Sequence, residues 1–292
     1  MATVDIAETA PAAAEPPPRA GRHGLGLIFW LAAAWIGVVF ATAILANVLP
    51  LDDPSKMSLL ARRQAPSFAH WLGTDHLGRD MLSRVIHGGR VSLAVGLVAP
   101  FLGLLAGGAL GLLAGYFRGR FETLAMGAMD VLLAFPPLVL ALAIIAFLGQ
   151  SVVNVTAVLA LLTVPAATRV ARAATLVFAQ REFVVAARAL GATHLRIMLR
   201  ELLPNVVLPL MVFQLVAVAV IIVAEGALSF LGLGVPPPTP SWGSMMSEGR
   251  EQLDVAPHIS FVPAIVMFLT VLAFNLIGDT LRRFIDPRRS AL

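Results

Sequence analysis

Long apolar runs separated by short polar segments set the pattern of this chain. A bilayer core about 30 Å thick requires roughly 20 apolar residues in each spanning helix, and six runs approach or exceed that length. The pattern therefore predicts an all-α membrane protein with six transmembrane helices. The predicted spans are residues 25–49, 91–115, 124–149, 152–168, 206–234 and 259–281.

Two of these spans have open boundaries. The first could be a cleaved signal peptide, but it is long and follows a Pro- and Ala-rich segment, which favours an uncleaved anchor helix over 25–49. The fourth is short, contains Pro165 and continues directly into Arg169 and Arg172, so its inner end stays open. Outside the spans, we expect a disordered cytoplasmic tail at 1–24 and a cytoplasmic C-terminal tail at 284–292.

The composition agrees with a membrane protein. The chain is 58% hydrophobic and 13% charged, with a mean hydropathy of +0.86, whereas soluble domains are about half apolar and about a quarter charged. The net charge of +4 does not indicate a nucleic-acid partner, because the basic residues are spread over many polar segments. Absence of cysteine from the sequence excludes disulfides and thiolate chemistry.

Charge distribution predicts the orientation. If the N-terminus lies inside, the inner segments carry 14 of the 21 Lys and Arg residues and the outer segments carry seven. Cytoplasmic loops of membrane proteins are enriched in Lys and Arg. We therefore expect a multi-pass protein with both termini in the cytoplasm.

The outer segment 50–90 contains a helical pattern near its end. Leu77, Met81, Val85 and Ile86 recur at helical spacing, with charged residues on the other faces. Such a pattern predicts a helix that lies flat at the membrane interface and leads into the second span.

Three acidic residues fall within the predicted spans. Asp130 and Asp279 lie near the inner ends of their spans, where they can reach the interface or pair with nearby arginines. Glu225 lies deeper, so it is expected either to form a structural hydrogen bond with a neighbouring helix or to line a passage. Asp130 is the second candidate for a passage-lining residue.

Prolines and glycines mark helix packing and bending. Five of the six spans contain proline, which removes a backbone donor and kinks a helix. The glycines of segment 103–115 have no accompanying lysine and lie in an apolar span, so we assign them to close helix packing and not to a phosphate-binding loop. The histidines lack metal-ligand spacing, so no metal site is expected.

The polar segment FVVAARALGATHLRIMLRELLPN, residues 183–205, is unusual among the loops. Two helical pieces fit it, at 181–190 and 193–203, with Gly191 at the break where a left-handed residue is needed. We therefore predict a compact helical turn at the inner membrane surface.

This segment resembles the coupling loop of bacterial ATP-binding-cassette (ABC) importer permeases, whose pattern is E-A-A-x(3)-G-x(9)-I-x-L-P. Ala186, Ala187, Gly191, Leu203 and Pro204 match the pattern, while Val185 replaces the glutamate and Glu201 the isoleucine. Three further stretches, 73–93, 225–243 and 274–288, resemble the C-type permease subunits of dipeptide, oligopeptide and nickel importers. Arg283 departs from that pattern, because relatives often have Asp there.

The resemblance implies a type I ABC importer permease fold, with a core over 91–283 and a coupling loop over 169–204. It also implies a bacterial inner-membrane protein that imports dipeptides or oligopeptides and is not itself an enzyme. The residues implied to couple to an ATPase are Val185, Ala186, Ala187, Arg188, Leu190, Gly191 and Pro204. Those implied to contact a binding protein are Arg79, Asp80 and Trp242.

The implied partners are a homologous second permease, two ATPase subunits and an extracytoplasmic substrate-binding protein, all acting within membrane lipid. ATP and Mg would be used by the ATPase subunits, and this chain would bind no cofactor. Within the family, import of nickel, opines or glutathione stays open as an alternative to peptides. An ion-coupled secondary transporter is the alternative from another class, although the inverted repeats and paired acidic sites typical of that class are not evident.

Overall fold

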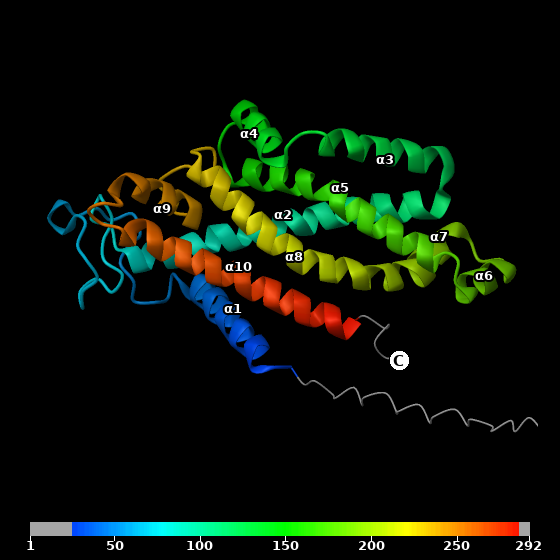
Figure 1. Cartoon of the computed structure of the whole chain (residues 1–292), viewed down its shortest axis with the longest axis horizontal. Helices are drawn as coiled ribbons and strands as arrows, with labels where there is room; N and C mark the ends of the chain where they lie inside the picture. Colours follow the sequence, from blue (N-terminus) through cyan, green and yellow to red (C-terminus); the bar gives the residue numbers. More distant parts are fainter. Residues whose placement is uncertain (1–24, 286–292) are drawn as a thin grey trace, which may run out of the picture.

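The computed structural model describes residues 25–285, and all regular secondary structure in that range is helical. The helices form an elongated bundle with loops and short helices gathered at its two ends (Figure 1). The predicted tail 1–24 and most of the predicted tail 284–292 lie outside the described residues.

Among the described residues, five helices are long and apolar enough to cross a membrane, and a bent pair of helices would make a sixth span if the two are counted together. The five are α1 (Leu27–Leu45), α2 (Met81–Phe117), α5 (Val152–Phe178), α8 (Leu203–Phe230) and α10 (His258–Ile285). The pair consists of α3 (Gly119–Leu133) and α4 (Pro137–Leu148). The short elements are η1 (Leu59–Ala61), α6 (Glu182–Ala189), α7 (His194–Arg196), the π-helical turn η2 (Ile197–Leu202), α9 (Trp242–Gly249) and η3 (Arg250–Gln252).

The predicted third span, residues 124–149, corresponds to two helices and not to one. α3 and α4 meet at an angle of 84° across Ala134–Pro136. Two consecutive prolines explain the break: Pro136 adopts an extended ψ of 123°, as expected before another proline, and Pro137 begins α4. The pair must still cross the bundle, because α2 ends at one end and α5 begins at the other.

The predicted interfacial helix at the end of segment 50–90 is wrong. A single helix of 37 residues, α2, begins at Met81 and continues through the second span. Asp80 caps its N-terminus by accepting a hydrogen bond from the backbone N–H of Ser83. The polar turns need not lie at a water interface, because α9 and the 50–80 segment pack around them.

The sequence left the inner end of the fourth span undecided. In the structure this span is α5, which continues ten residues beyond 168 to Phe178. Arg169 and Arg172 therefore belong to a helix, and the coupling loop predicted over 169–204 is shorter than expected. Both arginines pair with α3: Arg169 donates to Asp130 at 2.6 Å, and the Nε of Arg172 donates to Glu122 at 2.6 Å. These carboxylates allow the helix to carry two guanidinium groups close to the membrane.

The most extensive helix contact joins α2 to α5 through a row of glycines, in agreement with their predicted role in close packing. A Cβ on Gly107 would lie 2.5 Å from the carbonyl oxygen of Val164, and one on Gly111 would lie closer still to that of Thr168. Small residues at every fourth position therefore let the two backbones approach directly. The facing residues of α5 are Thr163, Ala167, Ala171 and Thr175.

The remaining spans are arranged around this pair. α8 packs against both α2 and α5, α10 packs on α8, and α1 packs on α10 (Figure 1). The indole N–H of Trp35 in α1 donates to the hydroxyl of Thr270 in α10 at 3.2 Å. Most of the α1 surface is exposed and apolar, as expected for a helix at the lipid-facing edge of a bundle.

Candidate functional site

One end of the bundle carries a bent segment, residues 179–203, which we call the elbow. It contains α6, a turn at Gly191, α7 and η2. Gly191 has a φ of +76°, the left-handed conformation that glycine adopts without strain. The predicted pair of helical pieces with a break at Gly191 is confirmed, but the second piece does not end near Leu203; it continues through η2 into α8.

The turn at Gly191 closes α6 in a Schellman motif. The N–H of Ala192 donates to the carbonyl of Ala187, and the N–H of Gly191 donates to that of Arg188, each at 3.0 Å. A Cβ on Gly191 would meet no atom within 4 Å, so the glycine is required by its backbone conformation and not by crowding.

The elbow has one buried and one exposed apolar face. Val184 is fully buried, whereas Val185, Leu195 and Leu190 are exposed, Leu190 to 88%. Exposed apolar side chains grouped at the end of a bundle typically mark a surface that a partner covers. The predicted coupling residues 185–191 all lie on α6 and its cap, while Pro204 lies beyond η2 at the start of α8.

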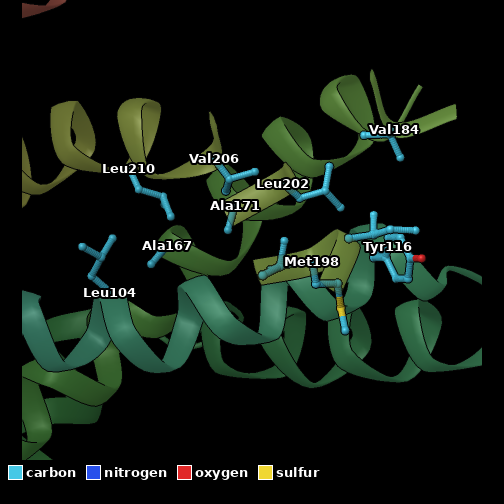
Figure 2. Packing of buried hydrophobic residues seen from close by; sticks show 11 residues of the cluster. Leu104, Tyr116, Ala167, Ala171, Val184, Met198, Leu202, Val206 and Leu210 are labelled. Carbon is cyan, nitrogen blue, oxygen red and sulfur yellow. The ribbon is translucent and has the colours of Figure 1, made fainter. Parts of the chain in front are cut away.

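The buried face of the elbow joins the core at the end of α2. Val184 from α6 and Ile197, Met198 and Leu202 from η2 pack with Tyr116 of α2 (Figure 2). Tyr116 and its partner His194 were not identified from the sequence. The available signal was weak: Tyr116 is the one tyrosine of the chain and follows directly on an apolar span.

The opposite end of the bundle is closed by buried ion pairs, which we call the outer cap. Arg79 pairs with Asp75 at 2.5 Å and with Glu248 of α9 at 2.6 Å, and Arg84 donates to Glu248 at 2.9 Å. Asp75, Arg79 and Arg84 are almost completely buried. The cap therefore ties the segment before α2 to α9, which is distant in sequence.

The three residues predicted to contact a binding protein, Arg79, Asp80 and Trp242, all have partners within the permease. Arg79 is held in the outer cap, and Asp80 caps α2 while lying 3.0 Å from the Nδ1 of His70. Trp242 is 1% exposed and donates its indole N–H to the carbonyl of Val85 at 3.0 Å. All three side chains therefore make contacts within this end of the bundle, and their contact with a binding protein stays a prediction.

Glu225 lies fully buried between α2 and α8. Its carboxylate accepts hydrogen bonds from Ser92 of α2 at 2.9 Å and from Ser229 of α8 at 2.7 Å. This is the geometry of the structural alternative, a hydrogen bond to a neighbouring helix. Asp130, in contrast, is exposed and paired with Arg169.

Near the outer cap lies a cavity of about 340 Å³, lined in part by His76, Glu248 and Ser229. Ligand atoms of Asp75, His76 and Glu248 lie within 4.8 Å of one another, the one such group found among residues 25–285. The guanidinium groups of Arg79 and Arg84 already contact both carboxylates, so a metal cation would be opposed by two neighbouring positive charges.

Comparison with known proteins identifies the family. The model of the family described as "Binding-protein-dependent transport system inner membrane component" matches residues 107–291. The chain belongs to this family. It is therefore a permease subunit of a binding-protein-dependent importer and a multi-pass protein of the inner membrane.

Curated relatives and solved structures agree with this assignment. The permease is 41% identical to the glutathione transport system permease protein GsiD of Pectobacterium atrosepticum, over 88% of this chain and 86% of that protein. It is 43% identical to GsiD of Escherichia coli O1:K1, over 88% and 85%.

The structural matches concern the fold. The MetNI methionine ABC transporter in an inward-facing conformation matches with a TM-score of 0.59 at 18% identity, over 70% of this permease and 98% of that chain. An amino acid ABC transporter with histidines matches with a TM-score of 0.52 at 17% identity, over 70% and 95%. The predicted fold of a type I ABC importer permease is confirmed.

Proposed function

We propose that this permease forms half of the translocation pathway of an ATP-driven importer of small peptides, with glutathione as the first cargo to test. The single observation that carries the cargo proposal is the 41–43% identity, over 88% of the chain, to permeases named for glutathione transport. Glutathione is one of the alternatives to dipeptides and oligopeptides that the family resemblance left open, and it is chemically a tripeptide.

We further propose that the elbow is the element that docks into the ATPase. Three features support the proposal: a rigid helix cap at Gly191, apolar side chains exposed at its tip, and a buried face attached to α2 and α5. Val185 stands where relatives have glutamate, so docking would depend more on apolar burial and on Arg188. Movement of the ATPase subunits would then reach the spans as a rigid-body displacement.

The full transporter would contain a second permease, two ATPase subunits and an extracytoplasmic binding protein. The sequence contains no phosphate-binding loop, so ATP and Mg would be bound by the ATPase subunits. The outer cap and the elbow lie at opposite ends of the bundle (Figure 1), so the binding protein and the ATPase would act on opposite membrane faces.

Reconstitution of the complete transporter in proteoliposomes tests the proposal. With the binding protein supplied on the outer side, uptake of radiolabelled glutathione should require ATP and should persist when the proton gradient is collapsed. Dipeptides, oligopeptides and chelated nickel would be assayed in parallel. Uptake that follows the proton gradient and ignores ATP would contradict the proposal, and ATP-driven uptake of another cargo would correct the choice of glutathione.

A further inference from the structure

Tyr116 lies where three parts of the permease meet. It is in the last turn of α2 and is 8% exposed, packed among Val184 of α6 and Met198 of η2 (Figure 2). α6 and α7 are the two limbs of the elbow, and Tyr116 contacts both of them through chemically different groups.

The first contact is a hydrogen bond to α7. The Tyr116 hydroxyl lies 2.8 Å from the Nδ1 of His194, the first residue of α7. Their rings are arranged edge to face with centroids 5.7 Å apart, so the hydrogen bond and the ring contact fix the same geometry.

The second contact is a cation–π interaction with α6. The guanidinium carbon of Arg188 lies 5.6 Å from the centroid of the Tyr116 ring. Arg188 is in the last turn of α6, and its carbonyl accepts one of the two hydrogen bonds of the Schellman motif at Gly191. Tyr116 therefore bridges the limbs on either side of the turn.

On its other side, Tyr116 is anchored to the membrane-spanning core. The preceding residue, Gly115, is the last glycine of the row that packs α2 on α5, and a Cβ there would lie 2.7 Å from that of Thr175. α2 cannot slide freely past α5 at this point, because the two backbones are in direct contact. A displacement of the elbow that moves Tyr116 must therefore move α2 and α5 together.

We propose that Tyr116 is a positioning residue that transmits movement of the elbow to α2. Its hydroxyl connects to α7 through the hydrogen bond with His194, and its ring connects to α6 through the cation–π contact with Arg188. This inference rests on the proposed docking of the elbow to the ATPase. It adds a second connection to the membrane, because the elbow otherwise continues covalently into α5 and α8 and not into α2. Loss of the hydroxyl should loosen this connection without removing the ring from the core.

The test measures cargo molecules imported per ATP hydrolysed by the reconstituted transporter. Tyr116→Phe keeps the ring and removes the hydroxyl, and His194→Leu removes Nδ1 from the other partner. Since a hydrogen bond contributes roughly a fivefold factor to an equilibrium, each variant should lower the import-to-hydrolysis ratio by about fivefold. Assembly of the transporter should be unchanged.

Two further variants separate transmission from general damage. His194→Asn retains a hydrogen-bonding group near the position of Nδ1 and should restore most of the ratio. Thr123→Val removes a hydroxyl at the same end of the bundle that bonds to the Gly119 carbonyl of its own helix, so it should leave the ratio unchanged. The double variant Tyr116→Phe/His194→Leu should be no worse than either single variant, because both remove one shared interaction.

Wild-type ratios in both single variants would overturn the inference, as would a double variant whose loss equals the product of the two single losses. If Tyr116→Phe fails to assemble, the import-to-hydrolysis ratio of His194→Leu tests the inference instead. His194 is exposed, so its replacement leaves the core intact. Failure of the proposed function itself would be distinguishable, because the wild-type transporter would then show no ATP-driven uptake at all.

Discussion

At the scale of single residues, Glu225 shows how a buried carboxylate is accommodated within a membrane span. Its two oxygens accept from Ser92 and Ser229, and Ser92 in turn accepts from the backbone N–H of Trp242 at 3.2 Å. The hydroxyl of Ser241 donates to that of Ser229 at 3.3 Å. One carboxylate therefore organises contacts among α2, α8 and the start of α9.

We expect Glu225→Gln to assemble normally and to retain uptake within about twofold, because serine hydroxyls can rotate to accept from an amide. Glu225→Ala should lower the free energy of unfolding by about 2–4 kcal/mol, since it removes two hydrogen bonds and leaves a cavity. Thermal unfolding in detergent and uptake by vesicles would be measured side by side. Loss of uptake in Glu225→Gln at an unchanged melting temperature would instead indicate that Glu225 lines the passage.

The sequence identified Glu225 as unusual, since an acidic residue in an apolar span is rare. It did not identify its partners, because serine occurs throughout the chain and its hydrogen bonds depend on which helices become neighbours. The internal partners of Arg79 and Trp242 were missed for a related reason. From the sequence alone, charged and aromatic residues in a predicted loop are expected to lie at the surface. The structure is needed to show that Arg79 is buried in ion pairs with Asp75 and Glu248.

At the scale of elements, the row of glycines between α2 and α5 defines the most constrained contact in the bundle. We expect Gly111→Ala to destabilise the permease by about 1–3 kcal/mol, because the added methyl group would overlap the backbone of Thr168. A lower melting temperature in detergent would show this. Gly37→Ala in α1 is the matched control, since nothing lies within 4 Å of a Cβ there. Equal stability of the two variants would contradict the assignment.

The elbow gives a second prediction at this scale. Gly191→Arg should leave the permease assembled in the membrane but uncouple ATP hydrolysis from uptake, because the left-handed residue would be strained by about 1–2 kcal/mol and a bulky charge would be added at the tip. Gly191→Asn is the control, since asparagine tolerates this conformation better. Uptake and hydrolysis would be measured on the same proteoliposomes. Normal coupling by Gly191→Arg would refute the role proposed for the elbow.

Most elements were predictable from the sequence because their signals are local. Apolar length located the long helices, and a glycine between two helical patterns located the elbow. The bend between α3 and α4 was underestimated, although Pro136 and Pro137 were visible, because hydropathy alone gives a continuous apolar run. The length of α2 was missed because its polar first turns are stabilised by Glu248, a residue more than 160 positions away.

At the scale of the whole molecule, the two ends of the bundle differ in kind. One end is closed by the outer cap, in which buried charges are paired and the 50–80 segment is fixed to α9 and α10. For example, the Nε2 of His258 in α10 lies 3.0 Å from the carbonyl oxygen of Thr74. The other end exposes the apolar tip of the elbow. One end fixed by ion pairs and another end with exposed apolar side chains would suit a protein that is driven from the elbow end.

The difference between the two ends allows the orientation of the permease in the membrane to be tested by labelling single cysteines. The chain is suited to this test because its sequence contains no cysteine. Leu60→Cys lies in the 50–80 segment and Leu190→Cys lies at the tip of the elbow, and both parent side chains are highly exposed, to 97% and 88%. In intact spheroplasts that produce the permease without its ATPase subunits, a membrane-impermeant maleimide should label Leu60→Cys at once and Leu190→Cys only after the membrane is permeabilised. The unmodified permease provides a background without reactive thiols. The excess of Lys and Arg in the inner segments supports this orientation. Labelling of Leu190→Cys from outside would reverse it, and would place the elbow on the face where no cytosolic ATPase could reach it.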